Sequence, residues 1–288
     1  MIKDKIINTD RIYRGFRKRD KNSGIYGLRF TFLMNVFCLV IMVQSIIISC
    51  KEKNETGKIT INFNHQVDGN NLRVDTMIYT NAAGNPFLIT EVQYFISDIK
   101  LFKKDGTEIL INEIHYVDTD IRDSWNWLIN GDFPAGNYDS ISFVFGIPDE
   151  KNISNSFVNP PESFMFWPDF LGGGYHYLKL NGKWLEAGQT TQTTPFNCHL
   201  GRGQVYFSYP DSIIGFIPNE FRVSLPGSSF EMSVGDTKQI HLTMSIDEWF
   251  KNPNIYDLDY WGSYTMQNQE AMQTLKENGC DVFTVLID

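Results

Sequence analysis

Cysteine is scarce in this chain, with four residues among 288. Cys38 lies inside an apolar N-terminal run and Cys50 directly follows it, so only Cys198 and Cys280 remain for a folded domain. Two cysteines so far apart in sequence exclude a disulfide-rich scaffold. They could form one disulfide in an oxidising compartment, and a buried Cys198 with an exposed Cys280 is an equally good interpretation.

Common catalytic signatures are also missing. The sequence has no G-x-S-x-G, P-loop, H-E-x-x-H or C-x-x-C pattern, and the glycines at 172–174 and 201–203 lack the strand–helix context of a phosphate-binding loop. We therefore expect a protein that is not an enzyme. A weaker hypothesis is a hydrolase that uses paired acids among Asp118, Asp120 and Asp123. These acids are more simply a solvated loop, or a Ca²⁺ site built from oxygen ligands.

Positive charge is concentrated in the first 29 residues, which hold nine Lys and Arg and three acids. The whole chain has 25 basic and 34 acidic residues and a formal charge of -9. Without residues 1–49, 16 basic and 31 acidic side chains remain, which gives a formal charge of -15. Because phosphate affinity comes mainly from Lys and Arg, this balance excludes nucleic acid as a partner.

An uncharged apolar run, Phe30–Ser49, follows the basic segment and ends at Cys50. This pattern is typical of a secretory signal, and Ile47-Ile48-Ser49-Cys50 resembles a bacterial lipobox with a lipid on Cys50. The alternative is an uncleaved transmembrane helix, because about 20 apolar residues can span a bilayer. Lys51-Glu52 loosely fits the surface-export signal of Bacteroidetes-type lipoproteins. We expect an outer-membrane lipoprotein of the cell envelope, facing the periplasm or the cell surface.

Short apolar runs separated by turn residues dominate the sequence after residue 57. Lys58–His65 alternates apolar and polar residues, which predicts a strand with Ile59, Ile61 and Phe63 on one face and His65 with the polar set. Further strands are expected at Leu88–Phe95, Ile99–Phe102, Ile109–Val117, Tyr138–Phe145, Tyr175–Leu180, Gln204–Ser208, Phe221–Leu225 and Gln239–Ile246. The pattern predicts an all-β fold, an antiparallel β-sandwich with long loops.

Helical patterns are few. Met266–Glu277 has helical spacing and is followed by Asn278-Gly279, which predicts a short C-terminal helix. Pro148–Gly174 is an irregular stretch rich in Pro, Asn and Gly, and loops of this length are usually functional. The simplest division is a leader at 1–49, a tether at 50–57 and a single domain at 58–288.

Histidine and aromatic residues are the strongest candidates for chemistry. His65 follows the first predicted strand, His199 lies at a later strand edge, and the aromatic run Phe164–Pro168 falls between them, close to His176. Imidazole ligands near aromatic groups suit copper, and imidazole alone also suits zinc. His176 and His115 are expected beside such a site or as alternative ligands, and His241 within a late strand.

An ordered series of motifs runs through the predicted domain. Its members are Phe63–Gly69, Asn81–Gly84, Val92–Ile99, Pro134–Tyr138, Phe145-Gly146, Met165–Trp167, Gly174–Tyr177, Phe196–Gly201 and the tail Met266–Phe283. Together they resemble the MbnP-like domain family. The resemblance covers nearly all of residues 58–288, and the series is more specific than any single motif.

The resemblance implies an extracytoplasmic, all-β copper-binding protein. In characterised members, copper is held by His nitrogens and a Trp oxidised to kynurenine, a modification linked to a di-haem peroxidase-like partner. His65 matches the His after the first strand, His199 the His of the late H-x-G motif, and Trp167 the Trp of the M-x-W motif. Asp169 stands where some members have a further His, so a ligand set with that His is not available here.

Two hypotheses from different classes remain open at this point. The first is a lipid-anchored protein that sequesters or delivers copper. The second is a surface-anchored sandwich without metal, in which exposed aromatic residues bind a glycan or a partner protein. The candidates for that second role are Trp125, Trp127, Trp184 and Trp261. Trp167 itself is either the modified residue or an unmodified core aromatic.

Overall fold

A computed structural model describes residues 55–288. The predicted leader, the lipobox and Cys50 lie outside the described residues. The first strand begins at Thr56, two residues before the predicted start of the domain. Within residues 55–288, no helix is long and apolar enough to cross a membrane.

One sheet is built around the first strand. Its order is β16-β15-β1-β2, and β6 and β7 also pair with β1. The bounds are β1 Thr56–Val67, β2 Asn70–Asn71, β6 Asn126–Leu128, β7 Phe133–Pro134, β15 Thr237–Ser245 and β16 Phe283–Ile287. β1 and β15 run parallel, with Lys58 opposite Thr237. The predicted all-β sandwich is confirmed, and this parallel pair is a departure from a purely antiparallel arrangement.

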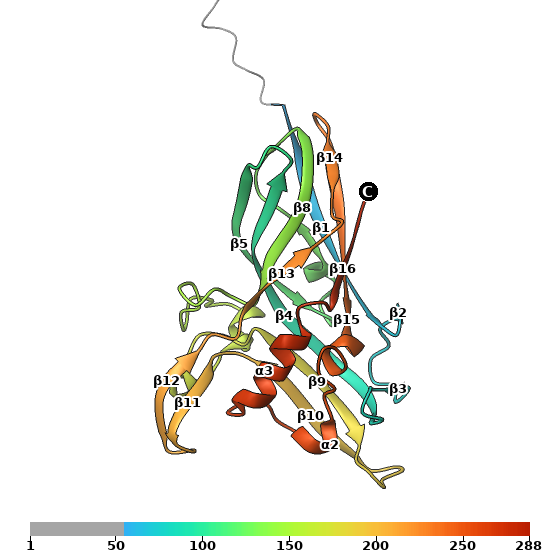
Figure 1. The fold of residues 1–288 in the computed structure, drawn as a ribbon, viewed down its shortest axis with the longest axis vertical. Coiled ribbons are helices and arrows are strands. Elements are labelled where there is room, and N and C mark those ends of the chain that lie inside the picture. Colours follow the sequence, from blue (N-terminus) through green and yellow to red (C-terminus); the bar gives the residue numbers. More distant parts are fainter. Residues whose placement is uncertain (1–54) are drawn as a thin grey trace, which may run out of the picture. The chain divides into compact units, whose positions relative to one another are not determined.

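The second sheet is larger and has the order β10-β9-β4-β8-β13. β3 and β5 also pair with β4, and β14 pairs with β8. The bounds are β3 Tyr79–Thr80, β4 Pro86–Lys103, β5 Glu108–Asp118, β8 Gly136–Phe145, β9 Leu178–Leu185, β10 Thr193–Leu200, β13 Phe221–Leu225 and β14 Phe230–Met232. β11 (Gly203–Ser208) and β12 (Ser212–Ile217) form a separate hairpin at one side (Figure 1).

β4 joins two strands that were predicted separately, Leu88–Phe95 and Ile99–Phe102. Its pairing with β5 shifts register between Ser97 and Ile99, and Asp98 has a φ of 48°. An extra residue in one strand interrupts the two-residue alternation of side chains. The sequence pattern therefore breaks at this point although the strand continues.

The inner face of β1 explains the position of His65. Ile59, Ile61 and Phe63 are almost fully buried, and His65 is also buried, with 3% of its surface exposed. Side chains two residues apart in a strand share a face, so His65 follows the apolar set. The expectation that it points with the polar residues is wrong.

The helices are short. They are α2 (Leu258–Trp261), α3 (Gln269–Asn278) and the 3₁₀-helices η1 (Arg122–Trp125), η2 (Glu162–Met165), η3 (Asp169–Leu171) and η4 (Ile246–Phe250). α3 confirms the predicted C-terminal helix, and the Asn268 side chain caps it by accepting a hydrogen bond from the Ala271 amide. In the described chain Cys198 is buried, Cys280 is exposed and both are free. The interpretation of these two cysteines as free thiols, one buried and one exposed, is therefore confirmed.

Candidate metal centre

The register of the larger sheet places His199 on its outer face. His199 lies opposite Lys179 across β10 and β9, and Lys179 lies opposite Gln93 across β9 and β4. Directly opposite residues point to the same side of a sheet, so these three side chains share a face. Tyr94, the next residue on β4, points the other way and contacts His65 of β1. His199 therefore lies on the face that points away from β1.

His176 precedes β9 and its ring lies beside that of His199. The two ring centroids are 4.9 Å apart and the planes are at 88°. His176 Nδ1 is 2.9 Å from the carbonyl oxygen of Met165. A carbonyl oxygen can only accept, so Nδ1 carries the hydrogen and Nε2 carries the lone pair. That buried Nε2 has no hydrogen-bond partner among residues 55–288.

A relay of polar side chains orients the ring of His199. Its Nε2 lies 2.8 Å from Asn181 Oδ1, and Asn181 Nδ2 donates to Glu91 Oε2 at 3.3 Å. Because the carboxylate of Glu91 only accepts, the amide group of Asn181 turns its oxygen toward His199. Nε2 of His199 then carries the hydrogen and Nδ1 the lone pair. This Nδ1 is also buried, and nothing in the described part of the chain pairs with it.

Both rings are neutral, which is the form that binds metal. Burial, followed by the positive charge of Lys179, lowers the pKa of His176 to about 3. Burial also holds the pKa of His199 well below its usual value, with further lowering by His176 and Lys179. Buried lone pairs without partners are costly in a protein interior, and coordination of a metal ion is one way for two neighbouring neutral imidazoles to satisfy them.

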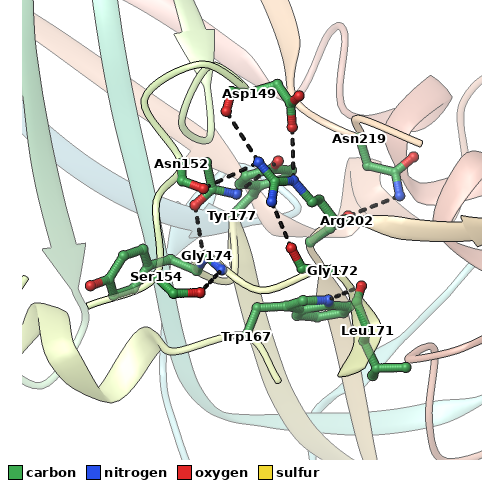
Figure 2. Close-up of polar contacts among 12 residues, drawn as sticks. Asp149, Asn152, Ser154, Trp167, Leu171, Gly172, Gly174, Tyr177, Arg202 and Asn219 are labelled. Carbon is green, nitrogen blue, oxygen red and sulfur yellow. Dashed lines mark hydrogen bonds and ion pairs between the residues drawn. The ribbon is translucent and has the colours of Figure 1, made fainter. Parts of the chain in front are cut away.

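Trp167 completes the candidate centre. Its side chain is fully buried, and its ring lies 4.7 Å from that of His176 in an edge-to-face arrangement. Its Nε1 donates to the Leu171 carbonyl oxygen at 3.1 Å (Figure 2). Gly201 lies against the ring, and a Cβ at that position would come within 2.4 Å of Trp167. The glycine is therefore required for this ring position.

Arg202 fixes the irregular loop that carries Trp167 (Figure 2). Its guanidinium donates to Asp149 Oδ1 at 2.8 Å and to the carbonyl oxygens of Asp149, Asn152 and Gly172. A planar group with several donors can bridge separate parts of one loop. Sequence reasoning missed this residue, because Gly-Arg-Gly at 201–203 was considered only as a phosphate-binding loop, which its context excludes. A single Arg between two glycines, directly after His199-Leu200, was the available signal.

His65 lies away from this centre. Its Nε2 is 3.1 Å from the hydroxyl of Tyr94, and its ring packs edge-to-face on Trp125. Burial and the charge of Arg122 lower the pKa of His65 to about 4. The structure thus brings together three of the four predicted metal residues, His176, His199 and Trp167. It places His65 on the opposite face of the larger sheet.

Comparison with known proteins gives matches that extend over most of the chain. A family model described as MbnP matches residues 56–270. The chain belongs to the MbnP family. Among solved structures, MbnP from Methylosinus trichosporium matches with 15% sequence identity and a TM-score of 0.46, over 70% of this chain and 80% of that one. No curated protein sequence matches. The resemblance inferred from the motifs is confirmed, and family membership associates the chain with extracytoplasmic copper proteins.

Three acidic residues of this MbnP domain lie close together, and one of them, Glu91, also belongs to the relay that orients His199. Ligand atoms of Glu91, Asp118 and Asp120 lie within 4.8 Å of one another. Asp118 is buried and accepts hydrogen bonds from Gln93 and from the hydroxyl of Tyr116. It is therefore not part of a solvated loop, contrary to the simplest sequence interpretation. A calcium ion at these acids stays a prediction.

The tryptophans of the MbnP domain do not form an exposed aromatic surface. Trp127 and Trp184 are 6% and 2% exposed, and Trp125 and Trp261 are partly buried. Trp127 stacks on His115, which makes that histidine a packing residue. The prediction that all four of these tryptophans are exposed is wrong, because Trp127 and Trp184 are part of the buried core.

Proposed function

We propose that this chain is a lipid-anchored copper-binding protein of the cell envelope. It binds one Cu(I) through Nε2 of His176 and Nδ1 of His199, beside Trp167, and sequesters or delivers that ion outside the cytoplasm. The observation that supports this proposal is the pair of buried, partnerless lone pairs on adjacent neutral rings. The chain has no catalytic role in this proposal.

The donor set favours Cu(I) over zinc. Two neutral imidazoles suit a soft ion of low coordination number, whereas zinc sites in proteins almost always use four ligands. Met165 and Trp167 are fully buried around the rings and limit access by water. A buried divalent ion without negative ligands would be poorly solvated, so the environment supports the ion of lower charge.

Trp167 has a specific part in this proposal. Oxidation to kynurenine, as in characterised family members, would add a donor atom next to His176. A di-haem peroxidase-like partner would supply the oxidising chemistry. Elemental analysis and intact mass of the protein from its native host test this part, because together they report copper, lipid on Cys50 and an oxidised Trp167. An unmodified Trp167 in copper-loaded protein would limit the ligands to the two histidines.

Titration with Cu(I) against a competing chelator tests the central proposal. Wild-type protein is expected to bind about one copper per chain, and His176→Ala and His199→Ala are each expected to lose tight binding. His65→Ala and His241→Ala serve as controls, since both alter a histidine outside the centre. Circular dichroism checks that each variant folds. Stoichiometric copper binding by the His176/His199 double variant would refute the proposal.

A further inference from the structure

We infer that Lys179 makes the centre at His176 and His199 selective for a monovalent over a divalent metal ion. The inference rests on the proposed function and goes further, because it names the residue that sets the charge of the ion. Lys179 lies directly opposite His199 across β9 and β10. Opposite residues of an antiparallel pair have Cβ atoms about 5 Å apart and share a face of the sheet.

The ammonium group is tied to the segment that contacts His176. Lys179 Nζ donates to the carbonyl oxygen of Phe164 at 2.6 Å. The next residue, Met165, orients His176 through its own carbonyl oxygen. Lys179 is partly buried, so water screens its charge less than on an open surface. Its position is therefore set by the same loop that covers the centre.

The charge of Lys179 acts on any cation at the centre. Burial lowers the pKa of Lys179, and the carboxylates of Glu91 and Asp118 oppose this and favour the ammonium form. Coulomb repulsion is proportional to the charge of the ion. A divalent ion therefore experiences twice the repulsion of a monovalent one.

The rings themselves cannot offset this repulsion. His176 and His199 are neutral ligands and bring no negative charge to the ion. Glu91 reaches His199 only through the amide group of Asn181. Replacing Lys179 by Met removes the charge and keeps an unbranched side chain. The divalent-to-monovalent affinity ratio is expected to rise on the order of tenfold.

Two variants separate charge from structure. Lys179→Arg keeps the positive charge and is expected to keep the wild-type ratio. Lys183→Met removes a charge from the same face of β9, four residues further along, a distance of roughly 13 Å. At physiological ionic strength this distance exceeds the Debye length of about 8 Å. Lys183→Met is therefore expected to leave the ratio unchanged.

The test uses the full chain without metal, titrated with Ag(I) as a redox-inert monovalent ion and with Zn(II) as a divalent ion. Preference for Ag(I) in wild type, with a raised Zn(II)-to-Ag(I) ratio in Lys179→Met alone, would support the inference. An unchanged ratio in Lys179→Met, or an equal rise in Lys183→Met, would overturn it. Failure of wild-type protein to bind either Ag(I) or Cu(I) would instead overturn the proposed function, and the inference with it.

Discussion

Acidification is expected to destabilise the metal-free protein through its buried neutral histidines. Burial is the main cause that lowers the pKa of His176 to about 3 and that of His65 to about 4, from 6.5 in the unfolded chain. Between pH 6.5 and the lowered pKa of each histidine, the unfolded state binds more protons than the folded state, so the free energy of unfolding falls as the pH falls. The contribution is fully present above pH 6.5 and is lost progressively toward each folded pKa.

The size of this effect follows from the two pKa values. One pKa unit corresponds to about 1.4 kcal/mol of stability, so His65 and His176 each account for about 3 kcal/mol between pH 6.5 and 4. Their combined loss of about 6 kcal/mol is comparable with the total stability of a typical domain, about 5–15 kcal/mol. Acid unfolding near pH 4 is therefore expected.

Urea unfolding followed by circular dichroism at pH 7, 6, 5 and 4 measures this loss. His65→Gln cannot take up the proton, so its loss of stability over this range should be smaller than in wild type by about 3 kcal/mol. Asn64→Gln changes an exposed, non-titrating neighbour on β1 and is the matched control. An equal loss in His65→Gln and wild type would show that burial does not hold this ring neutral.

Two further predictions concern the supports of the centre. Gly201→Ala places a Cβ 2.4 Å from the Trp167 ring and is expected to destabilise the protein by about 1–3 kcal/mol in thermal unfolding. Gly215→Ala is the control, because its Cβ would lie 3.8 Å from the nearest atom, and it should change the stability little. Asn181→Leu removes the acceptor for His199 Nε2 and should weaken Cu(I) binding by about 10–100-fold. Asn181→Asp keeps an acceptor, and equal weakening in both variants would contradict the proposed relay.

Much of the fold could be predicted because sheet structure leaves a local pattern. Strands β1, β5, β8 and β13 follow apolar runs of the expected length, and α3 follows helical spacing with a cap at each end. β4 was divided in two at Asp98, where the register shift reverses the alternation. β10 and β16 were not predicted as strands. In β10, polar residues and Pro195 surround the alternating Phe196, Cys198 and Leu200, which conceals the pattern.

The candidate site was predicted less completely than the fold. Trp167, His176 and His199 were all named as candidates, but His176 was expected to be an accessory residue and His65 a principal one. The two-residue repeat of β1 already places His65 with Ile59–Phe63, so the wrong orientation expected for its side chain came from the interpretation of the pattern. The choice between the histidines depends on which face of the larger sheet each side chain occupies.

The sequence by itself determined the fold class, the strongly acidic charge of residues 50–288 and the family, because all three depend on composition and on short ordered motifs. Only the tertiary structure decided which of the candidate residues lie together. Met165, His176 and His199 come together because the loop after Pro148 folds over β9 and β10, and strand register then aligns Lys179 and Asn181 with His199. Which ring nitrogens of His176 and His199 keep a free lone pair follows from hydrogen bonds between distant residues, and sequence spacing does not encode these bonds.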